Sequence, residues 1–90
     1  MTLAEYAQDI AEQLRNAHDT KDLAAVDPIF RKADVALLES GIGETRQRNF
    51  WATVRAHFNA SRLLIEKQAN SALIALMHAI QKELAARENK

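Results

Sequence analysis

The sequence predicts an all-α protein, a helical hairpin or small bundle of three to five helices in antiparallel packing, with a long C-terminal helix. Alanine, the strongest helix former, occurs 17 times among 90 residues, whereas glycine occurs twice and proline once. Apolar residues also recur at spacings of three and four along most of the chain, which is the period of an amphipathic helix. The length fits a single domain, residues 1–90.

The first helix is expected over residues 2–18. Thr2 is a preferred N-cap residue, and Glu5 three positions later completes a capping box. The polar side of this helix carries Glu5, Asp9 and Glu12, which we interpret as a solvated face because paired catalytic carboxylates need a cleft that separates their pKa values. Its apolar stripe consists of Leu3, Tyr6, Ala7, Ile10, Leu14 and Ala17.

The next elements are expected to be a short helical turn over residues 20–26 and a helix over residues 28–40. Asp27 is a favourable N-cap, and Pro28 suits the first helical position, so this pair predicts a helix start. Gly41 suits the left-handed position that ends many helices. The apolar stripe of this part consists of Val26, Ile29, Phe30, Ala33 and Leu37.

Residues 44–87 contain neither glycine nor proline. As one helix they would span ~66 Å at 1.5 Å per residue. A compact domain of this size has a radius of gyration of only ~12 Å. The helix therefore either breaks, with Asn70-Ser71 as the favoured position, or projects beyond its own domain. We favour a continuous or gently kinked helix.

Apolar side chains in residues 69–80 point in nearly every direction, which is typical of a helix buried on all sides. Because the rest of the chain is short, we expect a second chain to cover this segment, giving a homodimer through residues 69–84 or a complex with another helical protein. The alternative is a central place in a compact bundle, with alanines close to solvent. The expected contact residues are Phe50, Trp51, Phe58, Leu73, Leu76, Met77 and Ile80.

The formal net charge is zero, but residues 1–43 carry −4 and residues 44–90 carry +4. We expect the two halves to complement each other electrostatically. Three arginines spaced by seven, Arg48, Arg55 and Arg62, fall along one side of the long segment, beside its apolar face. They are candidates for contact with phosphates or other anions, or for ion pairs, with the acidic first helix as the obvious partner.

The sequence contains no pattern that points to catalysis. His18, His57 and His78 lack the spacing of a helical metal site, no serine lies in a nucleophile turn, and cysteine is absent. We therefore expect no catalytic, cofactor or metal site, no small-molecule substrate and no membrane association. The absence of cysteine fits a reducing compartment, here the cytoplasm, and the abundant alanine suggests a bacterial or phage source.

The predicted function is thus a non-catalytic protein–protein interaction module, such as an adaptor, chaperone, inhibitor or assembly subunit. The alternative is a small nucleic-acid-binding regulator that uses Arg48, Arg55 and Arg62.

Overall fold

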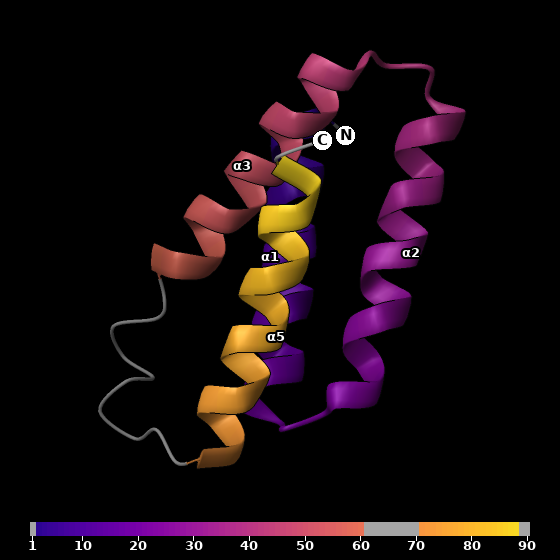
Figure 1. The fold of residues 1–90 in the computed structure, drawn as a ribbon. Helices are drawn as coiled ribbons and strands as arrows, with labels where there is room; N and C mark the ends of the chain where they lie inside the picture. The colour runs from indigo at the N-terminus through magenta and orange to yellow at the C-terminus, as the bar shows by residue number, and fades with distance from the viewer. Residues whose placement is uncertain (1, 61–70, 89–90) are drawn as a thin grey trace.

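The computed structural model describes residues 2–60 and 71–88, and within them it contains four helices and no strand. The helices are α1 (Leu3–Asp19), α2 (Leu23–Glu39), α3 (Glu44–Ala60) and α5 (Ser71–Glu88). They run alternately down and up, so each helix is antiparallel to the one before it (Figure 1). The predicted all-α bundle is confirmed.

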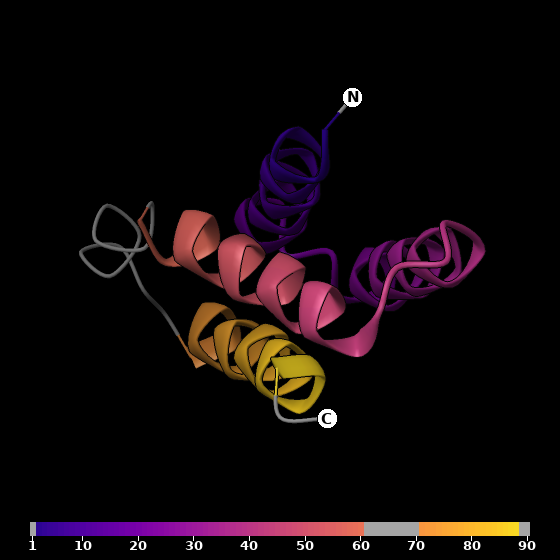
Figure 2. The ribbon, with the colours of Figure 1, turned by 90° about the horizontal axis from the view of Figure 1, so that it is seen from above.

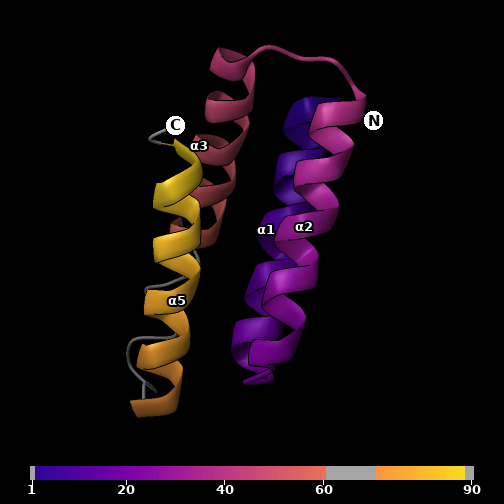
Figure 3. The same cartoon turned by 45° about the vertical axis from the view of Figure 1, so that its right-hand side comes forward.

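The four helices are not equivalent in their packing. Seen from above, α3 lies between α1 and α5, while α2 stands to one side (Figure 2). From a second direction α1 and α2 lie side by side, and α3 and α5 form the other pair (Figure 3). The main contacts of α2 are with α1. One side of α2 is therefore left open to solvent.

The first helix begins and ends as its local sequence dictates. The predicted capping box is present: the backbone N–H of Glu5 donates to Thr2 Oγ1 at 3.2 Å, and that of Thr2 donates to Glu5 Oε1 at 3.2 Å. At the other end Lys21 adopts a left-handed conformation with φ 57°. Its N–H donates to the His18 carbonyl, and that of Asp22 to the Ala17 carbonyl at 2.8 Å, which is the Schellman pattern.

Residues 23–39 form one helix, so the prediction of a short turn over residues 20–26 followed by a helix over residues 28–40 is wrong. Asp22 rather than Asp27 is the N-cap, and its Oδ1 accepts from Ala25 N–H at 3.2 Å. Pro28 consequently lies inside the helix. A proline there leaves the carbonyl four residues earlier, on Ala24, without its usual donor. Both residues are exposed, so water can reach that carbonyl.

The prediction for Gly41 is confirmed. This residue has φ 72° and its N–H donates to the Leu38 carbonyl at 3.2 Å, which closes the C-terminus of α2. A left-handed conformation favours glycine because other residues place Cβ close to the backbone there.

The continuous helix over residues 44–87 is not observed, and our preference for it was wrong. The chain forms α3 up to Ala60, and α5 from Ser71 runs back antiparallel beside it (Figure 1). Asn70, the favoured break point, lies outside the described residues. The physical reason for the reversal is burial: folding back takes Leu76, Ile80 and Leu84 out of water, whereas a projecting helix would leave them exposed.

The core runs the length of the bundle, and among the residues whose burial the structure describes it is apolar except for His18, which is 1% exposed. Its aromatic part joins α1, α2 and α3. The rings of Phe50 and Trp51 meet edge to face with their centroids 5.1 Å apart. The ring centroid of Tyr6 lies 5.4 Å from that of Phe50, and the ring centroid of Phe30 lies 5.5 Å from that of Trp51. None of the described helices is both long and apolar enough to cross a membrane.

Candidate interaction surface on α2

The residues expected to contact a second chain belong to the protein's own core. Six of the seven are buried, with exposed fractions from 0% to 9%, and they are Phe50, Trp51, Phe58, Leu76, Met77 and Ile80. The side chain of Leu73 lies outside the described residues. Apolar spacing marks a face that packs, but it does not say whether the opposing helix belongs to the same chain, so contact of these residues with a second chain stays a prediction.

The segment 69–80 is likewise not covered on all sides within this chain. In its described part, Leu76, Met77 and Ile80 face the core, whereas Ile74 and Ala75 are exposed. Small residues can lie at the surface with little apolar area in water. The compact bundle with alanine close to solvent fits part of the alternative expectation, but α3 rather than α5 takes the place between other helices (Figure 2).

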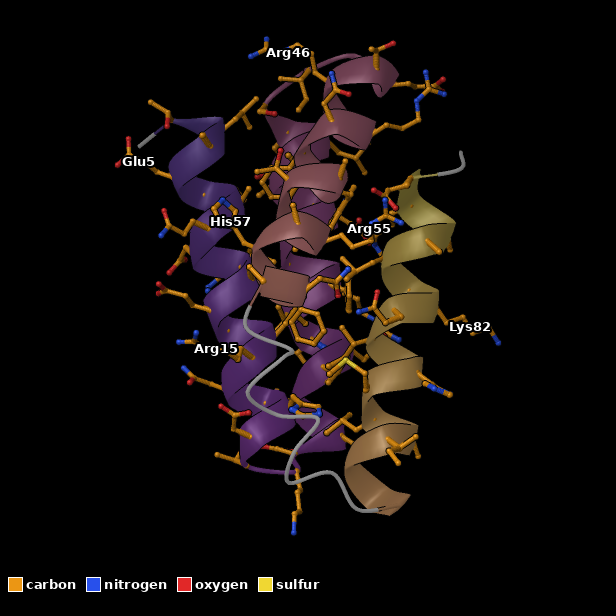
Figure 4. The ribbon with its side chains drawn as sticks, turned by 90° about the vertical axis from the view of Figure 1, so that its left-hand side faces the viewer. Glu5, Arg15, Arg46, Arg55, His57 and Lys82 are labelled. Atoms are coloured by element: carbon orange, nitrogen blue, oxygen red, sulfur yellow. The ribbon has the colours of Figure 1, made fainter. Side chains whose placement is uncertain are left out.

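The described arginines of the row are engaged within the chain. Arg55 projects from α3 towards α5, where its Nη1 pairs with Glu88 Oε2 at 3.0 Å (Figure 4). The Nη2 of Arg48 donates to the Thr45 hydroxyl at 3.4 Å, and Arg62 lies outside the described residues. The expected partner of Arg55, the acidic helix α1, is thus replaced by α5, because this edge of α3 faces α5.

Charge complementarity between the two halves of the chain is realised at Arg87. This α5 residue is 14% exposed and holds Asp34 of α2 with two bonds, Nε to Oδ1 at 3.1 Å and Nη2 to Oδ2 at 2.7 Å. Its Nη1 also donates to Glu83 Oε2 at 2.7 Å. The guanidinium also lies over two aromatic rings, those of Phe30 and Trp51, and its Cζ is 4.4 Å from the centroid of the Phe30 ring. These contacts tie α2 to the rest of the bundle.

The balance of these contacts also sets the proton affinity of Arg87. Burial alone lowers the pKa of the guanidinium, because it disfavours the charged form. The hydrogen bonds and charges of Asp34 and Glu83 outweigh burial, so the pKa of Arg87 is raised above its ordinary value. Arg87 therefore stays charged and acts as a permanent link between α5 and α2.

The open side of α2 carries three large apolar side chains in water. Leu23 is 62% exposed, Val35 52% and Leu38 70%; of the other described residues only Ile74, at 47%, belongs to this class. At 100° per residue the three fall within an arc of about 120° that excludes the buried stripe of α2. We call this arc the outer face of α2.

Two opposite charges occupy the middle of the outer face. Arg31 Nε pairs with Asp27 Oδ2 at 2.8 Å, and both side chains are mostly exposed. Leu23, Asp27, Arg31 and Val35 follow one another at intervals of four, so they form a single ridge along the helix. The ridge is apolar at both ends and charged at its centre.

A groove lies between α2 and α5, beside the N-terminal end of this ridge. It has a volume of about 380 Å³ and is lined by Leu23, Val26, Asp27, Ala79, Lys82 and Glu83. Leu23 and Asp27 belong to both the groove and the outer face, and Lys82 stands on its α5 rim (Figure 4). The groove and the outer face thus make one continuous surface with an apolar floor and charged edges.

Sequence reasoning missed this surface because it searched the apolar stripe of each helix. Leu23, Val35 and Leu38 lie off the stripe of α2, and this displacement was the signal available in the sequence. A single exposed leucine is ordinary, but several on one side of one helix are a reason to look for a partner.

The remaining polar side chains were compared with the requirements of a metal site. No group of three or more histidine, aspartate or glutamate side chains there could hold a metal ion. His18 is buried with its Nδ1 3.3 Å from Asp19 Oδ1 and its ring edge-on to Phe58. Comparisons of the chain with protein-family models, with curated proteins and with solved structures find no match.

Proposed function

We propose that this protein is a non-catalytic protein–protein interaction module that binds its partner through the outer face of α2. One observation carries the proposal: Leu23, Val35 and Leu38 are more than half exposed on one side of α2, away from its buried stripe of Val26, Phe30, Ala33 and Leu37. Burying one such side chain contributes about 1.5–3 kcal/mol. A partner that covers all three gains several kcal/mol.

The groove between α2 and α5 supports the same function. An amphipathic helix that lies in an apolar groove is a common mode of protein recognition. Interfaces of this kind have an apolar centre and a polar rim. Here Leu23 and Val26 supply apolar contacts, and Asp27, Lys82 and Glu83 supply the charged edge.

Binding of nucleic acid through the arginine row has less support. Arg55 would have to exchange its ion pair with Glu88 for a phosphate. Phosphate binding also weakens steeply as salt concentration rises, whereas an apolar interface does not. The salt dependence of any complex therefore separates the two functions.

The proposal is tested by photochemical cross-linking in the cells that make the protein. A photoreactive benzoylphenylalanine replaces Leu38, and the matched control carries it in place of Lys32, which is also exposed on α2 but lies outside the outer face. We expect a protein adduct from position 38 and none from position 32. An absence of adducts at position 38, or equal adducts at both positions, contradicts the proposal.

A further inference from the structure

We propose that the partner of the outer face is a second copy of this chain, docked with its α2 antiparallel to the first about a two-fold axis. This inference rests on the proposed function, since it names the occupant of the same surface. The order of side chains along the ridge Leu23, Asp27, Arg31 and Val35 points to this occupant.

The ridge is complementary to itself when it is reversed. In a two-fold antiparallel pair, each position of one helix faces the position that mirrors it about a common centre. With that centre at residue 29, Asp27 faces Arg31 of the second copy and Arg31 faces its Asp27. Each carboxylate keeps its bond to the arginine on its own helix, 2.8 Å away, because two oxygens can accept from two donors.

The same register matches the apolar ends. Leu23 of each copy faces Val35 of the other. Leu38 lies about one turn beyond Val35 on its own helix, so its position along the helix axis is within about 5 Å of Leu23 of the other copy. These three residues are the large apolar side chains that the isolated chain leaves exposed on this helix. A parallel pair would instead place Asp27 against Asp27 and Arg31 against Arg31, which is repulsive.

The surroundings of the ridge admit a second helix. Ala24 is exposed on the outer face, and a small side chain there allows two helices to approach closely. Leu23 also lines the groove, so Leu38 of the second copy reaches the groove mouth beside Ala79. The contact involves little more than one helix from each chain, so we expect association that depends on concentration.

The register is tested by disulfide trapping, for which the chain is suited because it contains no cysteine. Leu23→Cys and Val35→Cys are made separately, and each is examined alone and in an equimolar mixture in a glutathione redox buffer. A disulfide needs Cα atoms about 4.4–6.8 Å apart. In the proposed register only the mixture satisfies this distance, because two copies of position 23 are separated by about 18 Å along the axis.

We expect cross-linked dimer in the mixture and none in either variant alone. Cross-linking of Leu23→Cys with itself would indicate a parallel pair and would overturn the register, and no cross-linking in any sample would overturn the second copy as partner. Leu23→Cys mixed with Lys32→Cys is the matched control and should form no disulfide-linked dimer. All three positions are exposed, and circular dichroism verifies that each variant is folded.

Charge reversal gives an independent readout of the same contact. Asp27→Arg and Arg31→Glu each place like charges opposite one another in a homodimer, so each alone should associate at least about tenfold more weakly. In the mixture every facing pair is again opposite in sign, and association should return. If the mixture associates no better than the single variants, the proposed pairing is wrong.

The outcomes also separate this inference from the proposed function. If the photoreactive residue at position 38 yields an adduct with another protein and the cysteine variants do not cross-link, the interaction function stands and the second copy is excluded as partner. If position 38 yields no adduct and the cysteine variants do not cross-link, both proposals fail.

Discussion

Replacing Arg87 by glutamine tests how α2 is held in place. The change removes two hydrogen bonds to Asp34, two to Glu83 (one to its carbonyl and one to its carboxylate), and the guanidinium above Phe30. A hydrogen bond to a charged group is worth about 1.5–3 kcal/mol, and the lower end applies because Asp34 is 39% exposed. The contact with the Phe30 ring adds about 0.5–1 kcal/mol, and the exposed pair with Glu83 adds at most a few tenths.

The expected loss for Arg87→Gln is therefore about 2–3 kcal/mol of the free energy of unfolding. A domain of this size has a total of about 5–13 kcal/mol, so the variant should still fold. Arg87→Lys keeps the charge but loses the two-pronged contact with Asp34, and we expect about half of the loss. The matched control is Arg55→Gln, whose ion pair with Glu88 involves a side chain that is 48% exposed, with an expected loss below about 1 kcal/mol.

The assay is equilibrium unfolding in urea, followed by circular dichroism. A double-mutant cycle with Asp34→Asn isolates the pair, and a coupling energy of at least about 0.5 kcal/mol is expected for residues in direct contact. The reasoning is refuted if Arg87→Gln costs no more than Arg55→Gln, or if the cycle shows no coupling.

Three further predictions concern stability. Lys21→Gly should raise the free energy of unfolding by about 0.5–1 kcal/mol in urea titrations, because glycine adopts the left-handed conformation of this residue, φ 57°, without strain. A lower free energy of unfolding in this variant would contradict the assignment of strain to Lys21. Leu84→Ala should cost about 2–5 kcal/mol in the same titrations, since Leu84 is 0% exposed in the core; a cost under 1 kcal/mol would mean that the site is not packed as described. Burial, aided by Asp9, raises the pKa of Tyr6, so its contribution to stability is complete below the unfolded pKa of about 10 and is lost as the pH rises through the folded pKa. Thermal unfolding from pH 8 to 11 should accordingly show the wild type losing stability relative to Tyr6→Phe above about pH 10, and parallel curves would refute the shift.

Local signals in the sequence predicted those parts of the fold that depend on neighbouring residues. The capping box of Thr2 and Glu5 and the left-handed Gly41 were correctly predicted, because each depends on a few backbone groups close in sequence. The start of α2 was predicted wrongly because local signals alone do not choose between two possible N-caps. Asp22 and Asp27-Pro28 are both plausible starts, and only packing of Val26 in the core extends the helix past the proline.

Features that depend on distant residues were harder to predict. No glycine or proline marks the reversal between α3 and α5, because the gain that drives it is the burial of Ile80 and Leu84 against other helices. Burial within the chain was not foreseen for the same reason: Phe50 and Trp51 have the composition of an interface anchor, and here they pack in the core of this chain. The three large apolar residues of the outer face lie off the apolar stripe in the sequence, but the structure was needed to establish that no other described helix of the chain covers them.

The central claim, that the outer face of α2 is a docking surface for a second copy, is tested most directly by the solution mass across a dilution series. Light scattering should show a mass that rises with concentration from 10.1 kDa towards twice that value. Leu38→Glu should remain at the monomer mass, and Lys32→Glu should behave like the wild type. A mass of 10.1 kDa at every concentration, or association that Leu38→Glu leaves unchanged, would contradict the claim.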